Sequence, residues 1–193
     1  MNGRDGDAAT EDEEQRVGAL RVAPSTEPTD TRWIRIGADL AHARRAVHRA
    51  CHTPPEQALI ITAPGYGRYG RERHRLALDV LCAMHQVAEK HHVLPATVGN
   101  WLHAEGATTT EVSPQDIADR FTAAYIGPFS DEMAYTHQRM AELGWNSALA
   151  PAGIPDSYLD VHAIKRDWCT DRVRRVESGT CGRIEVFHRG QPH

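Results

Sequence analysis

Residues 65–70 read G-Y-G-R-Y-G, which matches the pattern G-x-G-x-x-G. In dinucleotide-binding proteins, such glycines let the backbone approach a pyrophosphate at the N-terminus of a helix. The segment follows an apolar run at 58–63 and precedes a helix-like stretch at 74–92, as the motif requires. However, no second strand is predicted after that helix, and Glu89, the acid about 20 residues on, lies on the helix and cannot bind a ribose. A nucleotide-binding enzyme that uses this loop is therefore an alternative interpretation, for which the sequence places no acid in reach of the ribose.

Basic side chains are concentrated in the same part of the chain. Residues 32–75 carry nine bases and three acids, and Tyr66 and Tyr69 are interleaved with the arginines. Arginines suit contacts with phosphates, and tyrosines suit stacking on bases, so this region could bind a nucleic acid. A basic surface that contacts acidic protein, including this chain's own acidic segments, is the other interpretation. The candidate residues are Arg44, Arg45, Arg49, Arg68, Arg71, Arg73 and Arg75.

Carboxylates are concentrated elsewhere. Residues 93–138 carry six acids and one base, Arg120, and more acids follow at 156–171. They indicate either an ordinary solvated surface or a surface that binds a basic partner. The candidates for partner binding are Glu105, Glu111, Asp116, Asp119, Asp131, Glu132, Asp156, Asp160 and Asp167.

Other catalytic or metal-binding patterns are weak. Histidines 85, 91, 92 and 103 form no H-E-x-x-H motif, and the four cysteines form no C-x-x-C pair. There is no G-x-S-x-G nucleophile motif. We therefore expect no catalytic residue, no metal and no cofactor, and hence a protein that is not an enzyme.

The order of predicted elements gives an α+β fold, an elongated chain of three small subdomains. Residues 1–16 are acidic, lack apolar periodicity and are predicted to be a disordered tail. We expect an N-terminal sheet-plus-helix subdomain at 17–73, a helical middle subdomain at 74–115, and a C-terminal subdomain of helices and a β-hairpin at 116–193.

The predicted elements within these subdomains follow from local patterns. The run at 58–63 is nearly all apolar and is expected to be a central strand. Ser130 is expected to cap a helix, and Tyr158 and Trp168 are expected to pack in the core. The other expected strands lie at 17–22, 33–36, 172–176 and 183–187. The other expected helices lie at 38–51, 74–92, 95–102, 114–124, 131–143 and 158–168. In the helix at 131–143, Met133, Met140 and Leu143 are expected to face inward.

No apolar run approaches the about 20 residues of a membrane span, and the polar N-terminus does not read as a signal peptide. We therefore expect a cytoplasmic protein.

Three segments in the last part of the chain resemble the ArdA antirestriction family. The first matches F-x-x-x-Y-x-G-x-[YF]-S-x-x-x-A through Phe121, Tyr125, Gly127, Phe129, Ser130 and Ala134. The second matches Y-[IL]-D-x-x-A-x-x-R-D through Tyr158, Asp160, Ala163, Arg166 and Asp167. The third is a closing strand with the pair Val186-Phe187, and Trp33 is similar to an early strand of the family.

This resemblance implies a function. ArdA proteins resemble DNA in shape and charge, and they occupy the DNA-binding groove of type I restriction-modification enzymes, which prevents cleavage. It also implies a homodimer and, as partner, the methyltransferase and specificity subunits of such an enzyme. The net charge of the whole chain is −4, but residues 32–75 have a net charge of +6. The acidic half alone could dock on the enzyme, or the partner could be different, such as a nucleic acid bound by 32–75.

The acidic tail yields a first prediction. Because residues 1–16 have no apolar face to bury, their deletion should leave the melting temperature nearly unchanged. Thermal unfolding followed by circular dichroism tests this, and a fall of many degrees would show that the tail packs on the rest of the chain.

Overall fold

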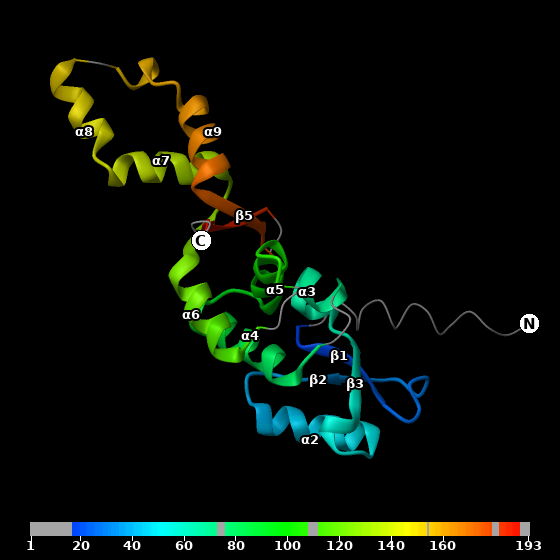
Figure 1. Cartoon of the computed structure of the whole chain (residues 1–193). Coiled ribbons are helices and arrows are strands. Elements are labelled where there is room, and N and C mark those ends of the chain that lie inside the picture. Colours follow the sequence, from blue (N-terminus) through cyan, green and yellow to red (C-terminus); the bar gives the residue numbers. More distant parts are fainter. Residues whose placement is uncertain (1–16, 73–75, 108–111, 154, 179–181, 190–193) are drawn as a thin grey trace, which may run out of the picture. The chain divides into compact units, whose positions relative to one another are not determined.

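The structure is a computed structural model that describes residues 17–72, 76–107, 112–153, 155–178 and 182–189. The tail at 1–16 and three of the candidate residues, Arg73, Arg75 and Glu111, lie outside these ranges. Contacts group the chain into two compact units, residues 1–122 and 123–193 (Figure 1). Each unit contains helices and a three-stranded antiparallel sheet, so the predicted α+β class is confirmed.

The sheet of the N-terminal unit has the strand order β2-β1-β3. Its strands are β1 (Ala19–Pro24), β2 (Arg32–Arg35) and β3 (Ala58–Thr62). The central strand is β1, of which only Arg21 is not fully buried. The expectation that 58–63 is central was wrong: β3 is an edge strand, and Leu59 and Ile61 are each 43% exposed. A run of apolar residues does not distinguish a strand covered on both faces from one covered on a single face.

Helix α2 (Leu40–Cys51) follows β2 in the chain. Asp39 caps its N-terminus by accepting hydrogen bonds from the backbone N–H groups of Ala41 and His42 at 2.8 and 3.0 Å. The inward face consists of Ala43, Val47 and Cys51, spaced by four residues, and the opposite face is polar. The chain then passes through the 3-10 turn η1 (Pro55–Gln57) into β3.

The helical part of this unit begins where β3 ends. Its elements are η2 (Pro64–Tyr66), α3 (Gly67–Glu72), α4 (Leu78–His91), α5 (Pro95–Ala104) and α6 (Pro114–Ala124), the last of which extends into the second unit. Tyr66 and Tyr69 are 0% and 1% exposed. The Tyr66 ring meets the ring of His85 from α4 edge-on, at a centroid distance of 5.4 Å.

Two glycines permit this packing. At Gly70 an added Cβ would lie 2.0 Å from the carbonyl oxygen of Ala63, and at Gly99 of α5 it would lie 1.8 Å from the carbonyl oxygen of Tyr66. Only a residue without a side chain allows backbone segments to approach so closely. The segments before and after residue 74 therefore share one core, and the predicted subdomains 17–73 and 74–115 fall within a single unit.

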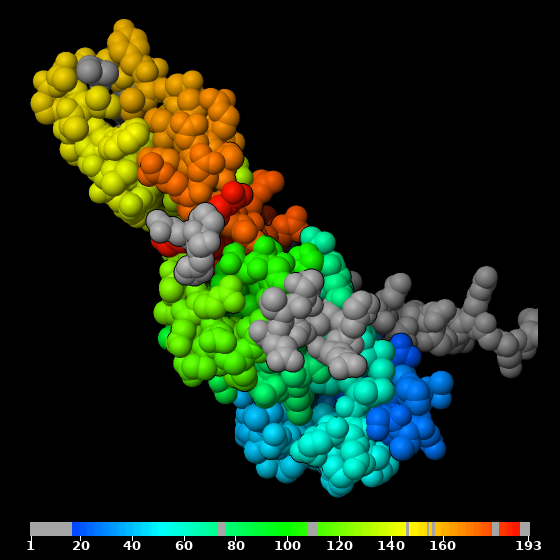
Figure 2. Space-filling view, viewed as in Figure 1, coloured from blue at the N-terminus to red at the C-terminus, as the bar shows by residue number. Residues whose placement is uncertain are grey.

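The C-terminal unit has the strand order β4-β6-β5. Its elements are β4 (Tyr125–Phe129), α7 (Glu132–Glu142), α8 (Trp145–Leu149), η3 (Ala150–Ala152), η4 (Asp156–Tyr158), α9 (Val161–Asp171), β5 (Val173–Glu177) and β6 (Ile184–His188). By residue number, the colours of the helices α7 to α9 run from yellow-green to orange in Figure 2. Tyr135, Val173 and Val186 form the centre of the core, and β5 and β6 pair as the hairpin predicted from the sequence.

Two of the expected packing residues behave differently. Trp168 is 8% exposed and packs against Trp145 at a centroid distance of 5.5 Å, as expected of a core residue. Tyr158 is 79% exposed, so its assignment to the core was wrong. The reason is that α9 begins at Val161, which leaves Tyr158 in the separate turn η4. Leu143, also expected to face inward, is 48% exposed because α7 ends one residue before it.

The contact at Gly99 can be tested by Gly99→Ala. Alanine is favoured over glycine inside a helix by about 1 kcal/mol. The clash with the Tyr66 carbonyl should nevertheless lower the free energy of unfolding by about 1–3 kcal/mol. Urea denaturation measures this. Gly37→Ala is the matched control, because nothing lies within 4 Å of its Cβ position, and equal stability of the two variants would contradict the packing role.

Candidate functional site

In the N-terminal unit, α6 presents two of the predicted acidic residues. Asp116 and Asp119 are both exposed and lie three residues apart, on one face of the helix. The hydroxyl of Ser113 accepts a hydrogen bond from the backbone N–H of Asp116 at 3.1 Å, as an N-terminal cap does. The side chain of Gln115 donates to both carboxylate oxygens of Asp119 at 3.0 and 3.1 Å. Among the described residues, neither aspartate forms an ion pair.

Glu105 is arranged differently from these two aspartates. The carboxylate of Glu105 lies 3.6 Å from the guanidinium of Arg120, and its side chain is only 18% exposed. Its charge is therefore partly neutralised within the unit. The predicted acidic residue Glu111 lies outside the described residues.

In the C-terminal unit, aspartates cap two helices. Asp131 accepts a hydrogen bond from the backbone N–H of Ala134 at 2.8 Å, and Asp160 accepts one from Ala163 at 3.0 Å. Both aspartates are exposed. The cap of α7 was expected at Ser130, and the structure places it one residue later, at Asp131. Each carboxylate lies at the positive end of a helix dipole, which stabilises its charge.

Glu132 serves the packing of the C-terminal unit. Its two oxygens lie 3.4 Å from the Lys165 ammonium of α9 and 3.2 Å from the Arg175 guanidinium of β5. This carboxylate therefore links three elements and offers little charge to a partner. Asp167 is exposed on α9, whereas the side chain of Asp156 lies outside the description.

The predicted acidic residues thus belong to two sets, one in each unit. Asp116 and Asp119 belong to the N-terminal unit, and Asp131, Asp160 and Asp167 belong to the C-terminal unit.

The residues of the F-x-x-x-Y-x-G-x-F segment occupy structural positions. Phe121 is fully buried and meets Trp101 edge-on at a centroid distance of 5.2 Å. Gly127 has a φ of +150° at an irregularity between β4 and β6, a conformation that favours glycine. Phe129 packs edge-on against Tyr135 at 5.3 Å. These residues determine the fold around β4 and are not exposed candidates for binding.

The sequence did not reveal the role of Glu185, which is 5% exposed on β6. Its carboxylate accepts a hydrogen bond from the Tyr125 hydroxyl at 2.8 Å. Burial, and next the hydrogen bond to this carboxylate, raise the pKa of Tyr125 well above its usual range. The signal in the sequence was an acid between apolar residues in I-E-V-F, at a position where an alternating strand places a residue inside.

The basic candidates also divide into two groups. Arg44, Arg45 and Arg49 are exposed on α2. Arg68 and Arg71 are exposed on α3, where the Arg68 guanidinium pairs with Glu72 at 2.9 Å. The idea that tyrosines stack on bases beside these arginines was wrong, because Tyr66 and Tyr69 are buried.

The glycine pattern at 65–70 serves packing rather than phosphate binding. The segment is helical from Gly67, and Gly67 and Gly70 both lie against neighbouring backbone. The backbone N–H of Arg68, which a phosphate would need, donates instead to the side chain of Asn100 at 2.9 Å. These contacts remove the basis for a nucleotide site.

No group of three or more metal-ligating side chains occurs among the residues with described positions. Within the same residues, no helix is long and apolar enough to cross a membrane.

No protein-family model, curated protein or solved structure matches the chain.

The hydrogen bond between the half-buried Tyr125 and the buried Glu185 leads to a prediction about stability. Tyr125→Phe removes the hydroxyl that donates to the buried carboxylate of Glu185, which should cost about 1.5–3 kcal/mol of the free energy of unfolding. Tyr158→Phe is the matched control. The side chain of Tyr158 is 79% exposed, so removal of its hydroxyl should change the free energy of unfolding little. Urea denaturation measures both, and similar values for the two variants would show that the hydrogen bond does not stabilise the unit.

Proposed function

We propose that this chain is an antirestriction protein similar to ArdA. It binds the DNA-binding groove of a type I restriction-modification enzyme, at the methyltransferase and specificity subunits, and prevents cleavage. It acts without catalysing a reaction, as a homodimer in the cytoplasm, and its carboxylates take the place of DNA phosphates. The resemblance of the segments at 121–134 and 158–167 to that family supports this proposal.

The observation that carries the proposal is the set of exposed carboxylates at three helices. Asp116 lies in the first turn of α6 and Asp119 in the second, and Asp131 and Asp160 cap α7 and α9. Within the described ranges, none of the four forms an ion pair. They are therefore free to meet lysines and arginines of a groove that normally holds phosphates.

The charge of the C-terminal unit favours mimicry of DNA phosphates by a few exposed carboxylates rather than by the whole surface of the unit. Residues 123–193 carry nine acids and eight bases, so the net charge of this segment is close to zero. However, Lys165 and Arg175 pair with Glu132, and Arg139 pairs with Glu142 at 2.9 Å. These three cations are partly neutralised by Glu132 and Glu142, so they do not offset the charge of the capping aspartates Asp131 and Asp160. The interaction should be electrostatic and weakened by salt.

The experiment changes the four aspartates, 116, 119, 131 and 160, to asparagine. Asparagine caps helices about as well as aspartate, so charge is removed while the caps are kept. Each exposed charge should contribute about 0.2–1 kcal/mol, so one substitution should have little effect and all four together should raise the inhibitory concentration by about fourfold to several hundredfold. The measurement is ATP-dependent cleavage of unmodified plasmid by a purified type I enzyme.

The matched control removes four other exposed charges, through Glu27→Gln, Asp30→Asn, Asp79→Asn and Glu89→Gln. It should inhibit as well as the unchanged protein. The proposal is refuted if the unchanged protein does not inhibit a panel of type I enzymes, or if the four asparagines leave inhibition intact.

A further inference from the structure

The outward surface of α2 is strongly basic. Arg45 and Arg49 are exposed on the side opposite the buried Ala43 and Val47. The helix itself contains no acid, and Asp39 before it is engaged as its cap. Across the described part of the chain, neither arginine forms an ion pair. The proposed antirestriction function uses none of these residues.

The basic side chains surround a hollow of about 550 Å³. Arg45 and Arg49 are one helical turn apart, about 6 Å along the axis, and Arg44 and His48 form a second row with the same spacing. The hollow is lined by His42, Arg44, Arg45, His48, Arg49, Pro55 and Glu56, all from α2 and η1. It is a concave surface with three arginines and one acid.

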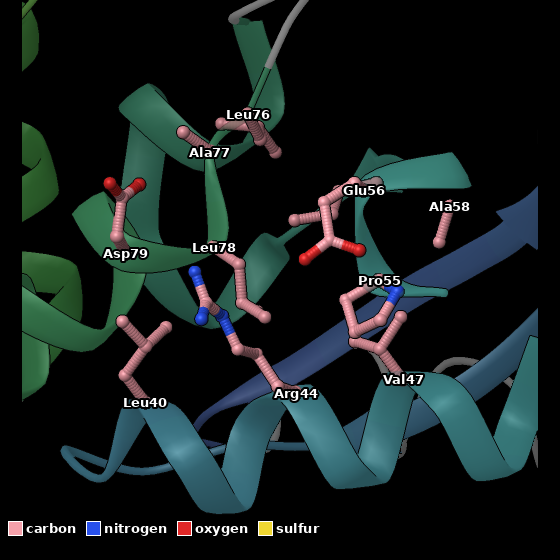
Figure 3. A pocket seen from close by; sticks show the side chains of 11 residues that line it. Leu40, Arg44, Val47, Pro55, Glu56, Ala58, Leu76, Ala77, Leu78 and Asp79 are labelled. Atoms are coloured by element: carbon pink, nitrogen blue, oxygen red, sulfur yellow. The ribbon is translucent and has the colours of Figure 1, made fainter. Parts of the chain in front are cut away.

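Arg44 differs from the other two arginines. It also lines a neighbouring hollow of about 250 Å³, where its guanidinium lies between the carboxylates of Glu56 and Asp79 (Figure 3). Two acids share this hollow with Arg44, whereas Glu56 is the one acid that lines the larger hollow. Arg45 and Arg49 line only the larger hollow, so we expect them to contribute more to its positive potential than Arg44 does.

We propose that this surface binds the phosphate backbone of a nucleic-acid duplex. The planar guanidinium of arginine donates two parallel hydrogen bonds to a phosphate, and the arginines at 45 and 49, with Arg44 beside them, can follow a charged backbone. The lining contains no aromatic side chain, so it provides no stacking platform for the bases of a single strand. Pro55 is the one apolar residue of the lining, so recognition at this surface rests on charge. Binding should therefore be independent of sequence.

The experiment measures fluorescence anisotropy of two labelled duplexes of unrelated sequence with the full chain, between about 50 and 200 mM salt. Both duplexes should bind equally well. The double variant Arg45→Ala, Arg49→Ala should bind about tenfold or more weakly, and its slope of log affinity against log salt should be smaller by about 2, since each phosphate contact contributes about 0.9. Arg44→Ala should have a smaller effect.

Two further variants complete the experiment. Arg166→Ala with Arg183→Ala removes the same charge from exposed positions of the C-terminal unit and should bind as the unchanged protein does. Arg45→Lys with Arg49→Lys keeps the charge and should keep the salt slope, which separates loss of charge from loss of folding.

Three results would overturn the proposal: no binding of either duplex at the lowest salt, equal weakening by the control pair, or tighter binding of polyglutamate than of duplex at equal charge. The last would assign the surface to an acidic protein. None of these results bears on inhibition of restriction, which depends on the aspartates of α6, α7 and α9, so the two proposals fail separately.

Discussion

The close approach of backbone at Gly70 and Gly99 is the contact on which the N-terminal unit depends. The carbonyl of Gly70 accepts a hydrogen bond from the N–H of Ala63 at 3.0 Å, so the end of β3 is tied to α3. Gly99 lets α5 approach the carbonyl of Tyr66 on the other side. Between these contacts, Tyr66 and Tyr69 are buried, and the sheet and the helices acquire one common core. Since protein interiors are closely packed, even one methyl group at either glycine has to displace backbone.

Much of the fold could be predicted because its local signals agreed with one another. Helix α2 shows apolar residues at Ala43 and Val47 and ends before Pro54, and the β5–β6 hairpin follows from two strand-like runs around a turn. The same reasoning failed where tertiary contacts decide. The segment 64–72 reads as a glycine-rich loop, and only its contacts with α5 make it helical and bury its tyrosines.

The candidate sites also divide into features that local sequence predicts and features that tertiary contacts decide. The sequence identified the exposed residues Asp116, Asp119 and Arg45, because charge density is visible in composition. It could not show that Glu132 is held by Lys165 and Arg175, since that ion-pair network requires α7, α9 and β5 to be brought together. Spacing along the chain predicts which residues share a helix face. Ion pairs between different elements depend instead on how the core brings those elements together.

The helix caps of the C-terminal unit have one more consequence. A partner that captures a long, mobile side chain must first restrict its rotamers, which costs about 0.5–1.5 kcal/mol for each side chain. Asp131 and Asp160 are short, and each already has one carboxylate oxygen fixed by a backbone N–H of its helix. Most of that conformational entropy is lost on folding rather than on binding. Carboxylates at helix caps are thus preorganised, as the phosphates of a stiff duplex are, and a glutamate in the middle of a helix is not.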